Sequence, residues 1–298
     1  MFKGFQEETV KGAGADVFMR IGGSTDAPPL VLLHGYPQTS AMWHLVAPIL
    51  SETYRVFCPD LRGYGRSGKP GTPGLDPTHS LYSKRAMAAD IVAAMAEMGI
   101  DRFFLAGHDR GGRVAHRLGM DFPETCPAIS VLDIAPTREM YASTDSKFAT
   151  AYWHWFFLIQ PYPIPENIIA KDPDNFWMGK NIANAGGENL FGKEALAEYL
   201  AAFRDPATIH GSCEDYRAAA TIDIEHDDAD GDAMLGMPLQ VLWAKDRVID
   251  RCFDPLELWR RRAKIVEGQT VKGTHYVAEE DPATIAKLYL DFFGRFSL

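Results

Sequence analysis

The chain has 298 residues, of which 46% are hydrophobic and 23% charged, so it can bury a large core and is not intrinsically disordered. The formal net charge of −10 disfavours nucleic acids and anionic membranes as partners. No run of about 18 apolar residues predicts a membrane span, and the mixed polar start predicts no signal peptide. Four scattered cysteines without a CxxC pair are typical of a reduced, cytoplasmic protein.

Short apolar runs alternate with helical stretches along the chain, which predicts an α/β fold with a mostly parallel sheet and crossover helices. The predicted buried strands are residues 30–33, 55–58, 103–106, 129–132 and 239–243. The predicted helices are residues 83–98, 111–120 and 282–293.

The strand pattern fades between residues 138 and 235, in a stretch rich in aromatic residues and prolines. It resumes after that stretch, at Leu239. We therefore expect an α/β core made of residues 1–137 and 236–298, with a helical cap at 138–235. A cap of this kind is a natural lid that excludes water from a reaction centre.

The segment around Asp109 is the most informative part of the sequence. A buried strand runs into Gly107-His108-Asp109-Arg110-Gly111 and then into a helix. This is the nucleophile-elbow pattern G-x-S-x-G of α/β hydrolases, with aspartate in place of serine. The helix dipole and the adjacent arginine favour an ionised carboxylate, which can attack a saturated carbon and form an ester. An N-cap is the alternative interpretation of an isolated aspartate at this position.

A base and its acid partner are expected further along the chain. His275 follows a short strand near the end of the sequence, where an α/β hydrolase places the base that activates water. Two acids are candidates for orienting it. Asp133 follows the strand 129–132, Asp246 follows the strand 239–243, and both positions lie at the same edge of the predicted sheet.

Polar residues near the elbow predict a site for an anion. Arg110 and Arg113 are three residues apart on the helix that begins after the nucleophile, so they share a face and are candidates for holding a substrate carboxylate. The loop with Tyr36, in His-Gly-Tyr-Pro after the first buried strand, is expected to supply backbone N–H groups to the reaction centre.

The departing group of an in-line attack points away from Asp109, towards the cap. Three cap residues offer an N–H or O–H without a negative charge, namely His154, Trp155 and Tyr216. The pattern alone favours a different interpretation, the aromatic core of a lid.

These residues closely resemble those of fluoroacetate (haloacetate) dehalogenases of the α/β-hydrolase superfamily. The likeness spans nearly the whole chain and is strongest in HGYPQTSAMWH, DLRGYGRSGKP, AGHDRGGR, VLDIAPT, YWHWFFLIQP and CEDYRA. The resemblance implies an α/β-hydrolase core with an inserted helical cap, a small anionic halogenated acid as substrate, and a homodimer. The chain departs from the family's usual His-Gly-Phe-Pro loop in having Tyr36, and it carries an acid, Asp246, that the family is expected to lack.

The resemblance also implies a role for each site residue. Asp109 is the expected nucleophile, His275 the water-activating base and Asp133 its acid partner. Arg110 and Arg113 are expected to hold the substrate carboxylate. The expected halide-binding residues are His154, Trp155 and Tyr216. Hydrolysis of fluoroacetate or chloroacetate to glycolate would then need no metal or organic cofactor, and no metal-ligand spacing is apparent in the sequence.

An epoxide hydrolase is the main alternative, since it shares the carboxylate nucleophile and the base. Its cap tyrosines would be drawn from Tyr141, Tyr152 and Tyr216. A neutral epoxide has no use for the arginine pair, however. A haloalkane dehalogenase would ordinarily have tryptophan after the nucleophile, and a serine esterase would need G-x-S-x-G. A non-catalytic binding protein of this fold would be expected to have lost the nucleophile or the base.

Overall fold

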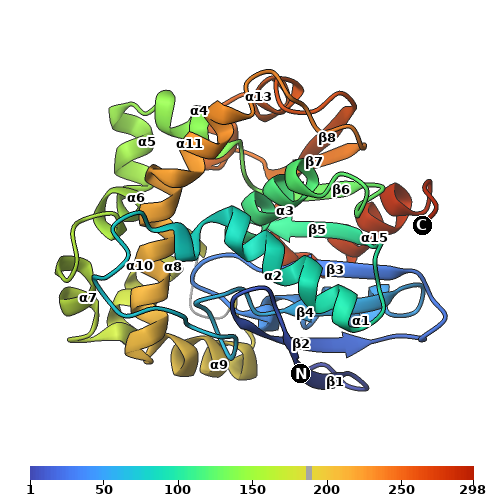
Figure 1. Ribbon diagram of the computed structural model, residues 1–298, viewed down its shortest axis with the longest axis horizontal. Helices are drawn as coiled ribbons and strands as arrows, with labels where there is room; N and C mark the ends of the chain where they lie inside the picture. The colour runs from blue at the N-terminus through green and yellow to red at the C-terminus, as the bar shows by residue number, and fades with distance from the viewer. Residues whose placement is uncertain (186–189) are drawn as a thin grey trace.

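The computed structural model describes residues 1–185 and 190–298, and its centre is one eight-stranded, mostly parallel sheet (Figure 1). The strand order is β1-β2-β4-β3-β5-β6-β7-β8. The first two strands pair antiparallel with each other, and β2 pairs antiparallel with β4, whereas all remaining pairs are parallel. The strands are β1 (Gln6–Lys11), β2 (Asp16–Gly22), β3 (Pro29–Leu33), β4 (Arg55–Pro59), β5 (Phe104–His108), β6 (Ile129–Leu132), β7 (Leu239–Ala244) and β8 (Val266–Val271).

The register of the central strands decides where the site can form. Leu33 at the end of β3 pairs with Gly107 on β5, and His108 at the end of β5 pairs with Leu132 at the end of β6. Parallel strands that end in register present their following loops at one edge of the sheet. The loops after β3, β5 and β6 therefore meet there. These strands are apolar and buried along almost their whole length, as expected for parallel strands covered on both faces.

Helices cover the two faces of the sheet. α2 and α3 pack side by side on the face that is nearest the viewer in Figure 1, and α1 packs against α15. Ser83 caps α2 by accepting a hydrogen bond from the backbone N–H of Ala86. The helices of this core are η1 (Ser40–Trp43), α1 (Val46–Leu50), η2 (Ser80–Tyr82), α2 (Lys84–Glu97), α3 (Arg110–Asp121), α12 (Val248–Cys252), α13 (Pro255–Arg260), α14 (Val277–Glu280) and α15 (Pro282–Phe293).

A helical insertion lies between β6 and β7 and stands at one side of the sheet (Figure 1). Its longest described helix, α10, packs against α6, α7, α9 and α11 and also reaches α2 and η2 of the core. The large aromatic side chains Trp177 and Tyr199 are fully buried between it and the core, where they donate hydrogen bonds to Pro37 and Glu279. Its helices are α4 (Thr137–Ala142), α5 (Ser146–Ala151), α6 (Trp153–Leu158), α7 (Ile164–Ile169), α8 (Pro173–Ala185), α9 (Lys193–Phe203), α10 (Pro206–Ala220) and α11 (Ile222–Ala229).

The α/β fold, the mostly parallel sheet and the helical insertion agree with the sequence prediction. The five strands predicted from apolar runs are β3 to β7, and the three predicted helices are α2, α3 and α15. The two antiparallel strands at one end of the sheet, β1 and β2, were not predicted. Almost all residues of β1 are polar and exposed, so this strand lacks an apolar run.

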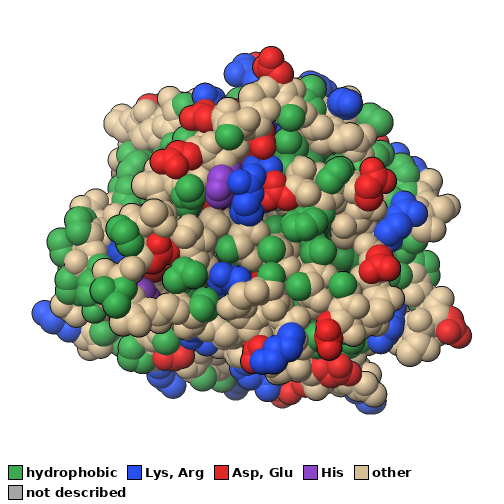
Figure 2. All heavy atoms as spheres, viewed as in Figure 1, with side chains coloured by type: hydrophobic (Ala, Val, Ile, Leu, Met, Phe, Trp, Pro, Cys, Tyr) green, Lys and Arg blue, Asp and Glu red, His purple; other side chains and the backbone are tan. Residues whose placement is uncertain are grey.

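The surface carries acidic and basic side chains interspersed with each other over the face that Figure 2 shows. Among the described residues, none of the helices combines the length and the apolar character needed to cross a lipid bilayer.

Candidate active site

Asp109 occupies a strained turn between β5 and α3. Its backbone has φ 44° and ψ −113°, a conformation that L-residues rarely adopt. The turn is tight because a Cβ on Gly107 would lie 2.4 Å from the carbonyl oxygen of Gly111, and a Cβ on Gly111 would lie 2.5 Å from that of His34. Only glycine fits at these two positions, so the glycines of the elbow pattern have a steric cause.

The environment of Asp109 favours its ionised form. Burial alone raises the pKa of this carboxyl, but His275, Arg113 and Arg110 outweigh burial and hold the pKa below its usual value. The backbone N–H of Tyr36 donates a hydrogen bond to Asp109 Oδ2 at 3.2 Å. Asp109 is therefore a buried carboxylate with a backbone donor beside it. The predicted loop after β3 supplies that donor.

His275 lies beside Asp109 and is bound to Asp133. The distance from His275 Nδ1 to Asp133 Oδ2 is 2.6 Å, and His275 Nε2 is 4.0 Å from Asp109 Oδ2. The other oxygen of Asp133 accepts from the backbone N–H of Ala244 at 2.9 Å, which fixes the carboxylate. With its Nδ1–H donated to Asp133, His275 presents the lone pair of Nε2 towards the nucleophile.

Asp246 was the second candidate for the acid, and the structure gives it a different position. It lies on the wall of the cavity above the nucleophile, and within the described residues it makes no hydrogen bond or ion pair with His275. The arrangement Asp109–His275–Asp133 thus draws its acid from the loop after β6.

His108 is a residue that sequence reasoning did not single out. Its ring packs 4.5 Å from that of His275, and its Nε2–H donates to the backbone oxygen of His275 at 2.8 Å. Burial, followed by the charge of His275, lowers the pKa of His108 to about 3, so it is neutral. It positions the loop that carries His275. A histidine before the nucleophile was visible in the sequence, but nothing indicated its partner.

Arg110 is held by an acid from the cap. It is fully buried, and its Nε and Nη2 donate to the two carboxylate oxygens of Asp215 on α10 at 2.9 and 2.6 Å. Tyr64 and Lys84 also bind Asp215. Among the described residues, Arg110 Nη1 has no hydrogen-bond partner. Asp215 therefore already occupies most of the guanidinium group of Arg110.

Arg113 is held by the loop after β6 and by the first residue of α4. Its Nη1 donates to Ala135 O at 3.1 Å and Thr137 Oγ1 at 2.8 Å. Its Nε lies 4.0 Å from Asp109 Oδ1 and has no hydrogen-bond partner within the part of the chain that the structure describes. The two arginines therefore each keep one unused donor near the nucleophile.

The three cap residues predicted to bind a halide do come together, over Asp109. The ring of Tyr216 lies 5.9 Å from that of His154 and 6.2 Å from that of Trp155. His154 Nδ1 and Tyr216 Oη are buried without a hydrogen-bond partner among the described residues. Burial, followed by Lys180, lowers the pKa of His154 well below its usual value, so its ring is neutral. The guanidinium groups of Arg110 and Arg113 stack on Tyr216 and Trp155 at 4.2 and 4.7 Å.

Tyr36 joins this group through its ring and its hydroxyl. The ring stacks on His154 at 6.2 Å and meets Tyr216 edge-on at 5.1 Å. Its hydroxyl is also buried and lacks a partner among the described residues. The Tyr36 hydroxyl therefore belongs to the wall of the site.

A cavity of about 320 Å³ leads to Asp109 from outside. Arg110, Arg113 and Tyr216 are buried and are not among the residues that line it. Arg113 lies against the lining residues Asp109 and Trp155, Tyr216 lies against Tyr36, and Arg110 packs on Tyr216. The lining residues are Tyr36, Asp109, Asp133, Lys147, Ala151, Tyr152, His154, Trp155, Lys180, Asp246, Arg247, Val248, Arg251, Cys252, His275 and Tyr276.

Lys180 on α8 is a further residue that the sequence did not indicate. It is buried in the cavity wall with its Nζ 4.8 Å above the ring of Tyr36 and 3.0 Å from Asn181 Oδ1. Burial lowers the pKa of Lys180 to about 8. A lysine on a cap helix ordinarily faces solvent, so only the packed cap reveals its position.

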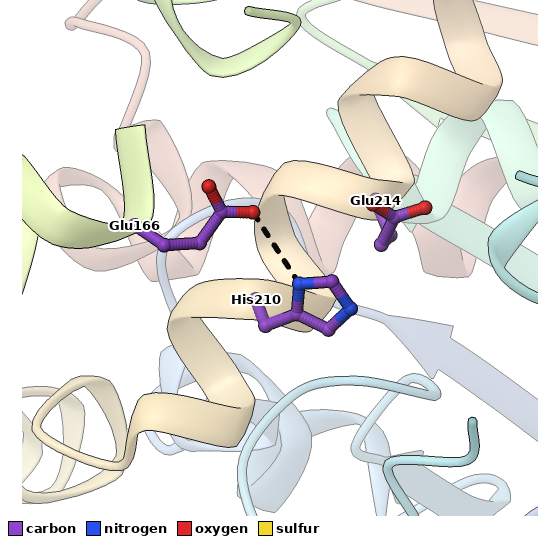
Figure 3. A group of neighbouring side chains, drawn as sticks. All are labelled: Glu166, His210 and Glu214. Carbon is purple, nitrogen blue, oxygen red and sulfur yellow. Dashed lines mark hydrogen bonds and ion pairs between the residues drawn. The ribbon is translucent and has the colours of Figure 1, made fainter. Parts of the chain in front are cut away.

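A second group of titratable residues lies within the cap, away from the cavity. Glu166, His210 and Glu214 place their ligand atoms within 4.8 Å of one another, close enough to hold a metal ion (Figure 3). Arg217 Nη1, however, donates to both glutamates at 2.7 Å, and His79 Nδ1 contacts Glu214 at 2.7 Å. The arginine supplies the positive charge that a metal would bring, so this group fits a structural ion-pair network.

Known proteins share both the fold and the length of this chain. The α/β hydrolase fold family matches residues 28–250. A fluoroacetate dehalogenase of Burkholderia sp. is 42% identical over 99% of this chain and 95% of its own length. A soluble epoxide hydrolase of Corynebacterium sp. is 32% identical over 89% of this chain and 90% of its own.

Solved structures give the same result. A Nostoc sp. PCC 7120 protein provisionally described as an α/β hydrolase has a TM-score of 0.95 and 44% identity, covering 99% of this chain and all of its own. A Pseudomonas aeruginosa protein provisionally described as an epoxide hydrolase has a TM-score of 0.90 and 39% identity, covering 98% and 96%. The chain therefore belongs to the α/β hydrolase fold family.

Proposed function

We propose that the protein is a hydrolytic dehalogenase of small 2-haloacids, such as chloroacetate or fluoroacetate, and that it releases glycolate and halide. The observation that carries this proposal is a set of buried donors around Asp109 that lack partners among the described residues. The set consists of Arg110 Nη1, Arg113 Nε, His154 Nδ1, Tyr216 Oη and Tyr36 Oη. Buried donors are costly unless something accepts from them, so they point to an anionic ligand.

A haloacid substrate supplies two groups that accept hydrogen bonds. Its carboxylate matches the remaining donors of Arg110 and Arg113, and its halogen matches the neutral donors of the cap. As the carbon–halogen bond breaks, negative charge grows on the halide. Donors that strengthen at that moment lower the barrier. The 42% identity to a fluoroacetate dehalogenase supports the same assignment.

The first chemical step is a displacement at carbon. A carboxylate oxygen of Asp109 attacks C2 of the haloacid, the C–O bond of an ester forms, and the carbon–halogen bond breaks with its electron pair leaving on the halide. The strained elbow holds the carboxylate at the edge of the sheet, and the cap lies on the opposite side of the reacting carbon. This arrangement suits in-line attack.

The second step hydrolyses the ester. His275 Nε2 takes a proton from water, and the resulting hydroxide attacks the carbonyl carbon of the Asp109 ester. Asp133 stabilises the imidazolium that forms, and the backbone N–H of Tyr36 stabilises the oxyanion. Collapse of this intermediate breaks the C–O bond to the acyl carbon, and the proton passes to the departing glycolate oxygen.

Epoxide hydrolysis is the second candidate, because the same Asp–His pair can open an epoxide. Tyr152 lines the cavity and the Corynebacterium relative is an epoxide hydrolase. A neutral epoxide leaves the donors of both arginines unused, whereas a haloacid uses them.

The decisive experiment measures chloride, fluoride and glycolate release from chloroacetate and fluoroacetate, with styrene oxide as the competing substrate. Asp109→Ala should abolish all turnover. Asp133→Asn should lower turnover strongly, and Asp246→Asn, which changes an acid on the same cavity wall, is its matched control. Turnover of styrene oxide without release of either halide would overturn the dehalogenase proposal and favour the epoxide hydrolase.

A further inference from the structure

The cavity is larger than a haloacetate needs. Its volume is about 320 Å³, within the range of about 300–1,000 Å³ that is typical of sites for drug-sized ligands. A haloacetate has only five non-hydrogen atoms. With its carboxylate near Arg110 and Arg113, it would fill the inner end of the cavity and leave the outer part unused.

The outer part of the cavity is lined by exposed cations. Lys147 lies on α5 of the cap, while Arg247 and Arg251 lie at the start and near the end of α12 in the core. All three side chains belong to exposed residues, whereas Asp109 and His154 at the inner end are buried. The cavity therefore opens to solvent between α5 and α12, which pack against each other.

Within the described part of the chain, these three cations are not engaged in close ion pairs. None of them has an ion-pair partner within 4.0 Å among the described residues, although most other arginines of the chain do. Lys147 Nζ donates to the backbone oxygen of Arg251 at 2.8 Å, and Arg247 Nε donates to that of Gly273 at 3.2 Å. Backbone carbonyls thus hold two of the side chains while leaving their charges unneutralised.

Three acidic residues lie near this opening, and only Asp246 among them lines the cavity. Asp246 is the acid on the outer wall. Asp250 accepts hydrogen bonds from Trp243 Nε1 and from the backbone N–H of Asp246, and Asp145 accepts from the backbone N–H of Phe148. The outer wall itself carries three cations and one anion, in a chain whose net charge is −10. A local cationic surface of this kind attracts an anionic group of a ligand.

We propose that the outer cavity is a second anion subsite, and that the protein acts best on 2-haloacids with a second, distal carboxylate, such as 2-chlorosuccinate. This inference rests on the proposed function. The inner carboxylate meets Arg110 and Arg113, C2 faces Asp109, and the remaining chain extends towards the opening, where Lys147, Arg247 and Arg251 receive the distal carboxylate. The reaction is the same displacement and ester hydrolysis, with a 2-hydroxydicarboxylate and chloride as products.

The test compares two substrates with the same number of carbon atoms, 2-chlorosuccinate and 2-chlorobutanoate, in which a methyl group replaces the distal carboxylate. We expect a kcat/KM ratio of roughly ten or more in favour of the dicarboxylate at low salt, because exposed ion pairs each contribute modestly and are screened by salt. The double variant Arg247→Gln/Arg251→Gln should bring the ratio close to one. Asp246→Asn should raise it.

The matched control is Lys264→Gln, which removes a positive charge from an exposed residue that does not line the cavity. It should leave the ratio unchanged. An equal kcat/KM for the two substrates in the unmodified protein would overturn the subsite. A fall in the kcat/KM ratio that is as large in Lys264→Gln as in the double variant would overturn it as well. Chloroacetate serves as the separate check on the proposed function: halide release from it, without any preference for the dicarboxylate, would overturn the subsite alone.

Discussion

Loss of the charge on Asp215 should destabilise the protein strongly, although this residue is not expected to touch the substrate. Asp215 is fully buried and binds three groups, namely Arg110, Lys84 and Tyr64. Asp215→Asn keeps the shape of the side chain and removes the charge. Arg110 would then be buried without its counter-ion, and among the described residues Lys84 would retain only Asp223, at 3.4 Å.

The expected loss is large because breaking a buried ion pair leaves an uncompensated charge in the interior, which costs about 3–5 kcal/mol. Urea unfolding at pH 7 measures it. The matched control is Glu257→Gln, which breaks an exposed pair with Arg261 on α13 and should cost about 0.5 kcal/mol or less. The double variant Arg110→Met/Asp215→Asn should be less destabilised than the sum of the single variants, since it removes the orphaned charge.

The effect should also depend on pH with a definite sign. Burial raises the pKa of Asp215, but Arg110 and Lys84 outweigh it and hold the pKa far below its usual value. Because the folded-state pKa is depressed, the stabilisation is fully present above the unfolded value, about 3.9, and is lost progressively as pH falls below it. A loss below about 1 kcal/mol at pH 7, or a difference that grows as pH falls below 4, would refute this reasoning.

Three further substitutions test other parts of the structure. Burial raises the pKa of Glu279 to about 8, so the folded state loses stability as pH rises from about 4.3 to 8. Glu279→Gln should therefore be more stable than the parent protein above pH 8, by about 3–5 kcal/mol. At pH 4 the two proteins should differ little in stability. Burial lowers the pKa of Lys180, so Lys180→Met should raise the free energy of unfolding at pH 7 by about 3 kcal/mol. The same substitution should increase KM for chloroacetate. An unchanged KM would contradict the place of Lys180 in the site. Gly107→Ala should cost at least about 1–3 kcal/mol because its Cβ meets backbone, whereas Gly236→Ala, with nothing within 4 Å, should cost far less in the same thermal melts.

The sequence predicted the parts of the fold whose signal is local. Buried parallel strands are short apolar runs, and the elbow around Asp109 requires glycines at fixed positions, so both are visible in a single chain. The edge strand β1 has mostly exposed polar residues and depends on pairing with β2, which no local pattern reveals.

The contacts across the site were harder to predict because they join distant parts of the chain. Arg110 and Asp215 are 105 residues apart, and their pairing depends on how the cap docks on the core. Asp133 and Asp246 follow neighbouring strands and were equivalent by position. The turn at Asp133, with φ 54°, and the hydrogen bond from Ala244 direct its carboxylate to His275.

The central claim is that Asp109 forms a covalent ester with the substrate, and trapping that ester tests it most directly. In His275→Gln the displacement should proceed while hydrolysis of the ester stalls. Incubation of this variant with chloroacetate should release one chloride per protein, and mass spectrometry should find one carboxymethyl group in the peptide that contains Asp109. Continuous glycolate production by this variant, or a carboxymethyl group on any other residue with Asp109 unmodified, would contradict the account.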